Sequence, residues 1–198
     1  MEILNIDCCM RDASRTAVIA RAFMDAALER YPGAHVTVRD IAAASPAPMN
    51  RERQRRREAL LERGELDAPE FALAREFAAA DRIVIAAPLW ELSFPAALKA
   101  YIENVSVAGI AFSYSDDGST GLCRAEKLAF ITSRGADFSS GPLADFEFGA
   151  SYLAALCRMY GIDGFITVAA DGLDAFGADA GAIVGAAKRD AVKKARTF

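Results

Sequence analysis

The stretch DRIVIAA, at residues 81–87, decides the fold class of this chain. Three branched apolar residues stand in succession in it without polar alternation, which is typical of a parallel strand buried on both faces. Helical patterns flank the stretch, one over residues 71–79 and one that starts at Pro95. A buried strand between two amphipathic helices predicts an α/β fold with a covered parallel sheet.

The alternation of strands and helices continues to both ends of the chain. Short apolar runs predict further strands at residues 3–6, 36–38, 128–132 and 165–169. Apolar spacing predicts further helices at residues 14–30, 145–160 and 178–195. Five strands separated by helices predict a doubly wound sheet. The flavodoxin-like strand order 2-1-3-4-5 fits better than the Rossmann order, because there are five strands and no GxGxxG follows the first.

The composition fits one globular domain that spans residues 1–198. The chain has 198 residues, of which 53% are hydrophobic and 25% charged, and its net charge is −4. This acidic balance argues against a nucleic-acid partner, and no apolar run of about 18 residues points to a membrane partner. Because a signal-peptide pattern and CxxC pairs are both absent, we expect a cytoplasmic protein with reduced thiols.

Residues 45–69 are predicted to form an excursion from the alternating pattern. They contain the run RERQRRRE at residues 51–58, in which arginine and glutamate are interleaved and no aromatic residue occurs. This composition favours a solvated helix over a nucleic-acid patch. The segment could also border an active site or a subunit interface.

The loop after the first strand, CCMRDASRT at residues 8–16, has the composition of a phosphate site. In a sheet of this kind, ligands bind beyond the carboxyl ends of the strands. Ser14 and Thr16 supply hydroxyl groups, the start of the next helix supplies free N–H groups, and Arg11 and Arg15 supply positive charge. The simpler alternative is that Ser14 only caps the helix.

Two other loops are expected to leave the same edge of the sheet. The loop APLWELSFP, at residues 87–95, carries Trp90, which could cover a planar ring or pack in the core. The loop TSRGAD, at residues 132–137, contains Gly135, which permits a ligand to approach the backbone closely. Each loop is a weak signal alone, but the predicted strand order places the two side by side.

With these loops in place, the sequence resembles the FMN-dependent NAD(P)H oxidoreductases of the quinone reductase and azoreductase family, which have a flavodoxin-like fold. The resemblance covers nearly the whole chain and is clearest in AAPLWELSFPAALKAYIENV (86–105), GIAFSYSDDG (109–118) and GLCRAEKLAFITSRGA (121–136). It implies hydride transfer from NADH or NADPH to FMN and onward transfer to a small-molecule electron acceptor, a quinone, azo or nitro compound. It also implies a homodimer.

The resemblance further implies which residues bind FMN. The phosphate would be held by Ser14, Arg15 and Thr16, in a loop lined by Cys8 and Arg11. The isoalloxazine would be bordered by Pro88, Leu89, Trp90, Glu91 and Leu92. Its pyrimidine end would be approached by Ser133, Arg134, Gly135 and Ala136. No side chain need act as an acid or base, because the flavin carries the chemistry. Glu91 and Ala136 depart from the family pattern, in which many members have Asn and Gly, and this leaves the role of Glu91 open.

Two other functions stay open. Residues 9–16 satisfy the pattern C-x5-R-T of low-molecular-weight tyrosine phosphatases, in which Cys9 would be the nucleophile. The Asp-Pro pair that would supply the general acid is absent from the sequence, and the loop lacks glycine. The second alternative is a non-enzymatic flavin-binding electron carrier, which turnover of NAD(P)H with a quinone would distinguish from a reductase.

Overall fold

A five-stranded parallel sheet lies at the centre of the computed structural model, which describes residues 1–116 and 118–198. Its strands lie in the order β2-β1-β3-β6-β7. In that order they span His35–Asp40, Glu2–Asp7, Arg82–Ala86, Lys127–Ser133 and Gly164–Ala170. Because β6 and β7 are the fourth and fifth strands of this sheet along the chain, the order is the predicted 2-1-3-4-5. The flavodoxin-like topology is therefore confirmed.

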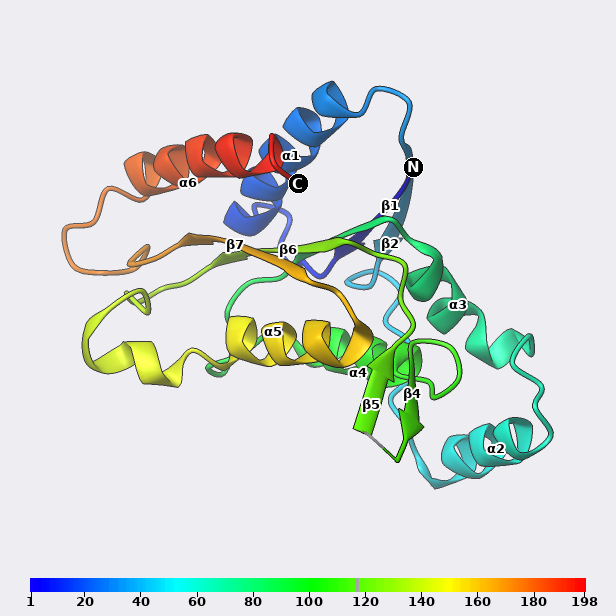
Figure 1. Cartoon of the computed structure of the whole chain (residues 1–198). Coiled ribbons are helices and arrows are strands. Elements are labelled where there is room, and N and C mark those ends of the chain that lie inside the picture. The colour runs from blue at the N-terminus through cyan, green and yellow to red at the C-terminus, as the bar shows by residue number, and fades with distance from the viewer. Residues whose placement is uncertain (117) are drawn as a thin grey trace.

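Helices cover both faces of the sheet (Figure 1). One face is covered by α1 (Arg15–Arg30) and α6 (Ala180–Ala195). The other face is covered by α3 (Ala72–Ala79), α4 (Ala96–Val105) and α5 (Phe148–Tyr160). The 3-10 turns η1 (Pro69–Phe71) and η2 (Gly141–Phe146) precede α3 and α5.

The predicted helices are all present, and each begins slightly later than predicted. In α1, α5 and α6 the reason is capping, because the cap residue lies outside the helix while its side chain accepts a hydrogen bond from the first turn. The helices α3 and α4 follow Phe71 and Pro95, which make no such bond. Ser14 caps α1 by accepting from the N–H of Ala17, and Glu147 and Asp179 cap α5 and α6 in the same way.

The run at residues 81–87 forms β3, and all of β3 is buried. Its side chains alternate between two cores. Ile83 and Ile85 belong to the core under α3, α4 and α5, whereas Val84 and Ala86 belong to the core under α1 and α6. The lack of polar alternation in the sequence is explained by this central position between β1 and β6.

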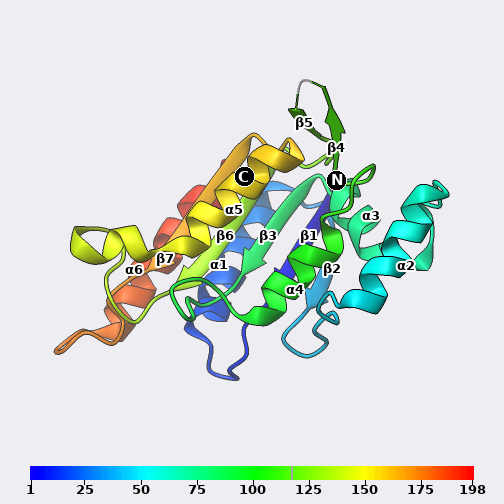
Figure 2. The same ribbon diagram turned by 90° about the horizontal axis from the view of Figure 1, so that it is seen from below.

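Two elements lie outside the central layers (Figure 2). Within the excursion, α2 (Arg51–Glu62) buries only Leu60, so the prediction of a solvated helix is confirmed. The antiparallel hairpin of β4 (Phe112–Ser115) and β5 (Gly118–Gly121) was not predicted, because GSTG has no apolar alternation. A turn is also expected from the sequence at residues 116–118, but residue 117 lies outside the described residues.

Hydrogen bonds join the loops at the carboxyl edge of the sheet. The N–H of Cys8 donates to Ala86 O (2.8 Å), and the N–H of Leu89 donates to Ser133 O (3.0 Å). The N–H of Arg134 donates to Ala170 O (2.8 Å). The loops after β1, β3, β6 and β7 therefore meet at this edge. Among the described residues, no helix has the length and apolar character needed to cross a bilayer.

Candidate functional site

The start of α1 has the electrostatic character of an anion site. Ser14 caps the helix, with its Oγ accepting from the N–H of Ala17 at 3.2 Å. The first turn contains no acidic residue that would offset the positive end of the helix dipole. Arg15 and, from the preceding loop, Arg11 add full positive charge. Ser14 therefore does cap the helix, and the surroundings of that cap favour an anion as well.

A cavity of about 400 Å³ opens beside this helix start. It is lined from the loop after β1 by Arg11, Ser14 and Arg15, from the loop after β3 by Pro88, Leu89 and Trp90, and from the end of β6 by Ser133, Arg134 and Gly135. Most of the residues predicted to bind a cofactor are thus brought together. The volume falls in the range of small-molecule and cofactor sites.

Cys8 and Thr16 are predicted site residues whose side chains lie away from this cavity. Cys8 is fully buried in the core under α4, because it continues the inward face of β1 that Leu4 and Ile6 occupy. Thr16 is also fully buried, and its Oγ1 lies 2.6 Å from Ser133 Oγ. Thr16 therefore holds the start of α1 against the end of β6, and its side chain does not line the cavity.

Cys9 is held in an environment that suppresses its reactivity. Its N–H donates to Asp7 Oδ1 (2.9 Å), and its Sγ lies 3.7 Å from Ala86 O. Burial raises the pKa of the Cys9 thiol from about 9 to about 12. A nucleophilic cysteine needs a lowered pKa, because the thiolate is the reactive form. The geometry gives no support to the phosphatase alternative.

A tight turn directs Glu91 and Leu92 away from the cavity. Trp90 and Ser93 exchange two backbone hydrogen bonds, of 2.9 and 3.2 Å, around these two residues. Glu91 and Leu92 have φ values of 48° and 65°, the left-handed conformation that a type I′ turn requires and that Gly and Asn adopt more easily. Both residues are exposed and absent from the cavity lining, whereas Trp90 borders the cavity. Ala136, another predicted site residue, is also absent from the lining.

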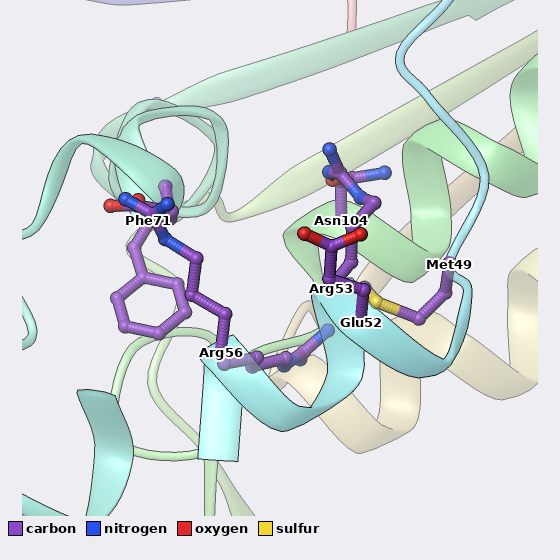
Figure 3. Close-up of a pocket in the computed structure, with 8 residues that line it drawn as sticks. Met49, Glu52, Arg53, Arg56, Phe71 and Asn104 are labelled. Atoms are coloured by element: carbon purple, nitrogen blue, oxygen red, sulfur yellow. Dashed lines mark hydrogen bonds and ion pairs between the residues drawn. The ribbon is translucent and has the colours of Figure 1, made fainter. Parts of the chain in front are cut away.

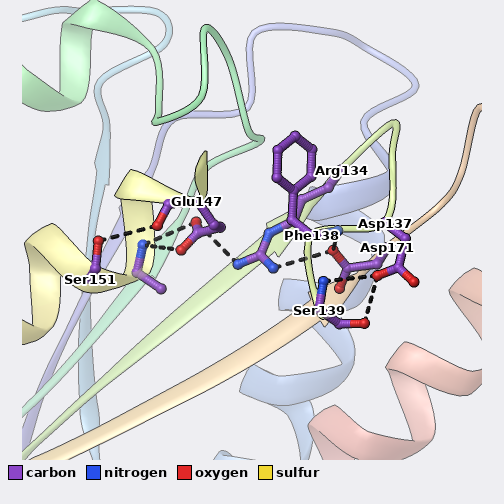
Figure 4. Close-up of polar contacts among 8 residues, drawn as sticks. Arg134, Asp137, Phe138, Ser139, Glu147, Ser151 and Asp171 are labelled. Atoms are coloured by element: carbon purple, nitrogen blue, oxygen red, sulfur yellow. Dashed lines mark hydrogen bonds and ion pairs between the residues drawn. The ribbon is translucent and has the colours of Figure 1, made fainter. Parts of the chain in front are cut away.

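Arg134 borders the cavity, but its charge is committed to two carboxylates (Figure 4). Its guanidinium lies 3.1 Å from Glu147 Oε1 and 3.2 Å from Asp171 Oδ1. Glu147 also caps α5 through the N–H of Ala150, and Asp171 accepts from the N–H of Phe138 at 3.2 Å. Arg134 therefore joins the ends of β6 and β7 to the start of α5.

Leu173 and Asp174 line the cavity and were missed in the sequence. They lie in the loop between β7 and α6, and the Asp174 carboxylate pairs with Arg15 Nη1 at 2.9 Å. The rule that selected the other three loops applies here too, since this loop also follows the carboxyl end of a sheet strand. The position of the loop after the last strand, together with its aspartate and glycine residues, could therefore have indicated a fourth binding loop.

A second cavity, of about 300 Å³, separates α2 from the body of the protein (Figure 3). Arg53 and Arg57 from α2 line it, but both guanidinium groups are engaged. Arg53 Nη2 donates to the Oδ1 of the buried Asn104 at 2.8 Å. Arg57 donates to Glu103 O (2.8 Å) and to Ser106 O, at the end of α4. These arginines dock α2 onto α4, which is a structural role for part of the arginine-rich run.

Comparison with known proteins gives consistent relatives. A family model described as "Flavodoxin-like fold" matches residues 1–195. An FMN-dependent NADH:quinone oxidoreductase 2 from Clostridium acetobutylicum is 45% identical over 123 residues, which are 62% of this chain and 60% of that protein. An FMN-dependent NADH:quinone oxidoreductase from Caldicellulosiruptor saccharolyticus is 38% identical over 130 residues, 66% of this chain and 65% of that protein. The matches thus span less than two thirds of these relatives.

A solved structure extends the likeness over the whole chain. The azoreductase from Bacillus anthracis str. Sterne superposes with a TM-score of 0.89 at 25% sequence identity, and the match covers 100% of both chains. The two proteins therefore share the fold over their whole length.

Proposed function

Because the chain belongs to the family whose model is described as "Flavodoxin-like fold", we propose that it is an FMN-dependent oxidoreductase. It takes hydride from NADH or NADPH and passes electrons to a quinone, azo or nitro compound. The observation that carries this proposal is the cavity of about 400 Å³ at the carboxyl edge, where the three loops selected from the sequence meet. The named activities of the curated relatives and of the azoreductase support the same reaction class.

The residues present fit an FMN phosphate at one end of the cavity. Ser14 and the free N–H groups at the start of α1 would hold its oxygens, and Arg11 and Arg15 would offset its charge. Gly135 lines the same cavity, and the space that a side chain there would need is occupied by the Asp174 carboxylate, since a Cβ added to Gly135 would lie 2.7 Å from Asp174 Oδ2. The fit rests on donors and cations placed where an anion would lie.

The remaining lining residues would orient the ring and shield it from water. When bound, FMN supplies the hydride and electron transfer, and the protein supplies position and electrostatics. Pro88, Leu89 and Trp90 offer an apolar wall on the side of the loop after β3. Glu91 adds no carboxylate to this wall, because the turn places its side chain outside the lining. The buried ion pairs of Arg134 fix the part of the lining that follows β6.

A homodimer remains part of the proposal. Several large apolar side chains in the segments that follow β3, β6 and β7 along the chain are exposed, namely Leu92, Leu143, Phe146, Phe148 and Phe176. Exposed large apolar side chains favour association with another protein surface. Sedimentation analysis should give about twice the monomer mass, and a monomer at all concentrations would contradict this part. A cytoplasmic location stays a prediction from the sequence.

The experiment is a visible absorption spectrum of the purified protein after FMN is added and the excess removed. We expect retained flavin that bleaches with NADH or NADPH and recovers when a quinone is added. Flavin that is retained but not reduced by either nucleotide would favour an electron carrier. If no flavin is retained, the proposal is wrong, and hydrolysis of an aryl phosphate would be tested with Cys9→Ser as the control.

A further inference from the structure

The carboxylate of Asp174 borders the candidate anion site at the start of α1. Its Oδ1 lies 2.9 Å from Arg15 Nη1, although the two residues are 159 positions apart in the chain. Its Oδ2 lies directly over Gly135, since a Cβ added there would be only 2.7 Å away. A negative group thus lies against one of the two arginines that border the start of α1.

The backbone of Asp174 is fixed in this place. The N–H of Asp174 donates to Gly135 O (2.8 Å), and the N–H of Leu173 donates to Arg134 O (3.2 Å). The N–H of Gly172 donates to Ala136 O (3.0 Å). Three consecutive hydrogen bonds therefore tie the loop after β7 to the loop after β6. The carboxylate can leave Arg15 by rotation of its side chain, but the loop itself stays beside the site.

We propose that Asp174 sets the affinity and selectivity of this site for phosphate-bearing ligands, because its carboxylate competes with a phosphate for Arg15. This inference rests on the proposed function. A phosphate that pairs with Arg15 must displace the carboxylate and then lie near a like charge, which disfavours binding. A flavin without a phosphate leaves the ion pair of Arg15 and Asp174 intact. Asp174 therefore lowers the ratio of the affinity for FMN to the affinity for riboflavin.

The test compares FMN and riboflavin binding to the whole chain by quenching of flavin fluorescence. We expect Asp174→Asn to bind FMN about three- to fivefold more tightly, the size that an exposed ion pair represents. Its affinity for riboflavin should stay within about twofold of the unaltered protein. Asparagine keeps the size of the side chain and can still accept a hydrogen bond from Arg15, so the change isolates the charge.

Two further variants make the result specific. Asp190→Asn removes the same charge from a half-exposed ion pair with Lys194 on α6, away from the cavity, and should leave both affinities unchanged. In an Arg15→Ala background, Asp174→Asn should lose most of its effect on the affinity for FMN, because the guanidinium for which the carboxylate and the phosphate compete is absent.

The possible outcomes separate this inference from the proposed function. Weaker FMN binding by Asp174→Asn, equal changes for FMN and riboflavin, or an undiminished effect without Arg15 would each overturn the role of Asp174. In all three cases the protein still binds flavin and the proposed function stands. If neither the unaltered protein nor the variant binds flavin, the proposed function is refuted and the inference with it.

Discussion

Replacing Arg134 by leucine should destabilise the protein strongly. The Arg134 side chain is only 6% exposed and lies between Glu147 and Asp171, whose side chains are 9% and 16% exposed. Removing it leaves two poorly hydrated carboxylates without their cation. Breaking a buried ion pair in this way costs about 3–5 kcal/mol of unfolding free energy, because the remaining charge stays buried and unpaired.

Two contacts place the expected loss near the lower end of that range. Arg134 Nε is buried without a hydrogen-bond partner, so the native pair is itself imperfect. Asp171 keeps the hydrogen bond from the N–H of Phe138 when the arginine is absent. We therefore expect a loss of about 3 kcal/mol, which corresponds to a fall in Tm of roughly 6–12 °C for a chain of this length.

Urea unfolding followed by circular dichroism, without added flavin, measures this loss. Arg63→Leu is the matched control, since Arg63 pairs with Glu65 at 2.5 Å on an exposed surface, and its effect on stability should be far smaller than that of Arg134→Leu. Glu147→Gln should cost less than Arg134→Leu, because the amide oxygen can still cap α5. Combined with Arg134→Leu, it should cost less than the sum of the two changes. A loss below about 1 kcal/mol for Arg134→Leu, or strict additivity, would refute the assigned role.

Four other predictions follow from local features of the structure. Glu91→Asn should raise the unfolding free energy by about 0.5–1 kcal/mol in urea, because asparagine tolerates the φ of 48° better; no gain would mean that the turn is unstrained. Cys9, with its pKa raised to about 12 by burial, should resist iodoacetamide at pH 8, and rapid alkylation would contradict the assigned burial. The same shift predicts that stability falls as pH rises from about 9 toward 12, because in that window only the unfolded thiol has released its proton. Gly121→Ala should cost about 1–3 kcal/mol or more, because the new Cβ would lie 2.0 Å from the Gly161 backbone, whereas Gly33→Ala meets no atom within 4 Å and should be nearly neutral.

The sequence alone was sufficient for the sheet and its strand order. A strand in the middle of a parallel sheet must be apolar on both faces, and residues 81–87 carry that requirement in their composition. The same logic located the three loops, because the carboxyl ends of parallel strands share one edge. The sequence therefore predicts which loops, and so which residue types, border the cavity.

The direction of individual side chains was decided by tertiary structure. Cys8 and Thr16 belong to a loop with the composition of a phosphate site, yet strand alternation and helix packing bury both of them. Glu91 leaves the cavity because the Trp90–Ser93 turn adopts a left-handed conformation that no residue type in it demands. Composition identifies a loop, but the backbone conformation of the folded loop decides which of its side chains line the cavity.

Long-range charge pairing was beyond the reach of the sequence for the same reason. From the sequence, Arg15 and Arg134 were both predicted to contact FMN, the first at its phosphate and the second at its ring. Folding brings Asp174 against the first, and Glu147 and Asp171 against the second. Residue types and spacing thus determined the fold and the edge of the sheet at which the cavity lies, because both follow from the alternation of strands and helices along the chain. The charge that a ligand would meet there was set by contacts between distant segments, which exist only once the loops have met.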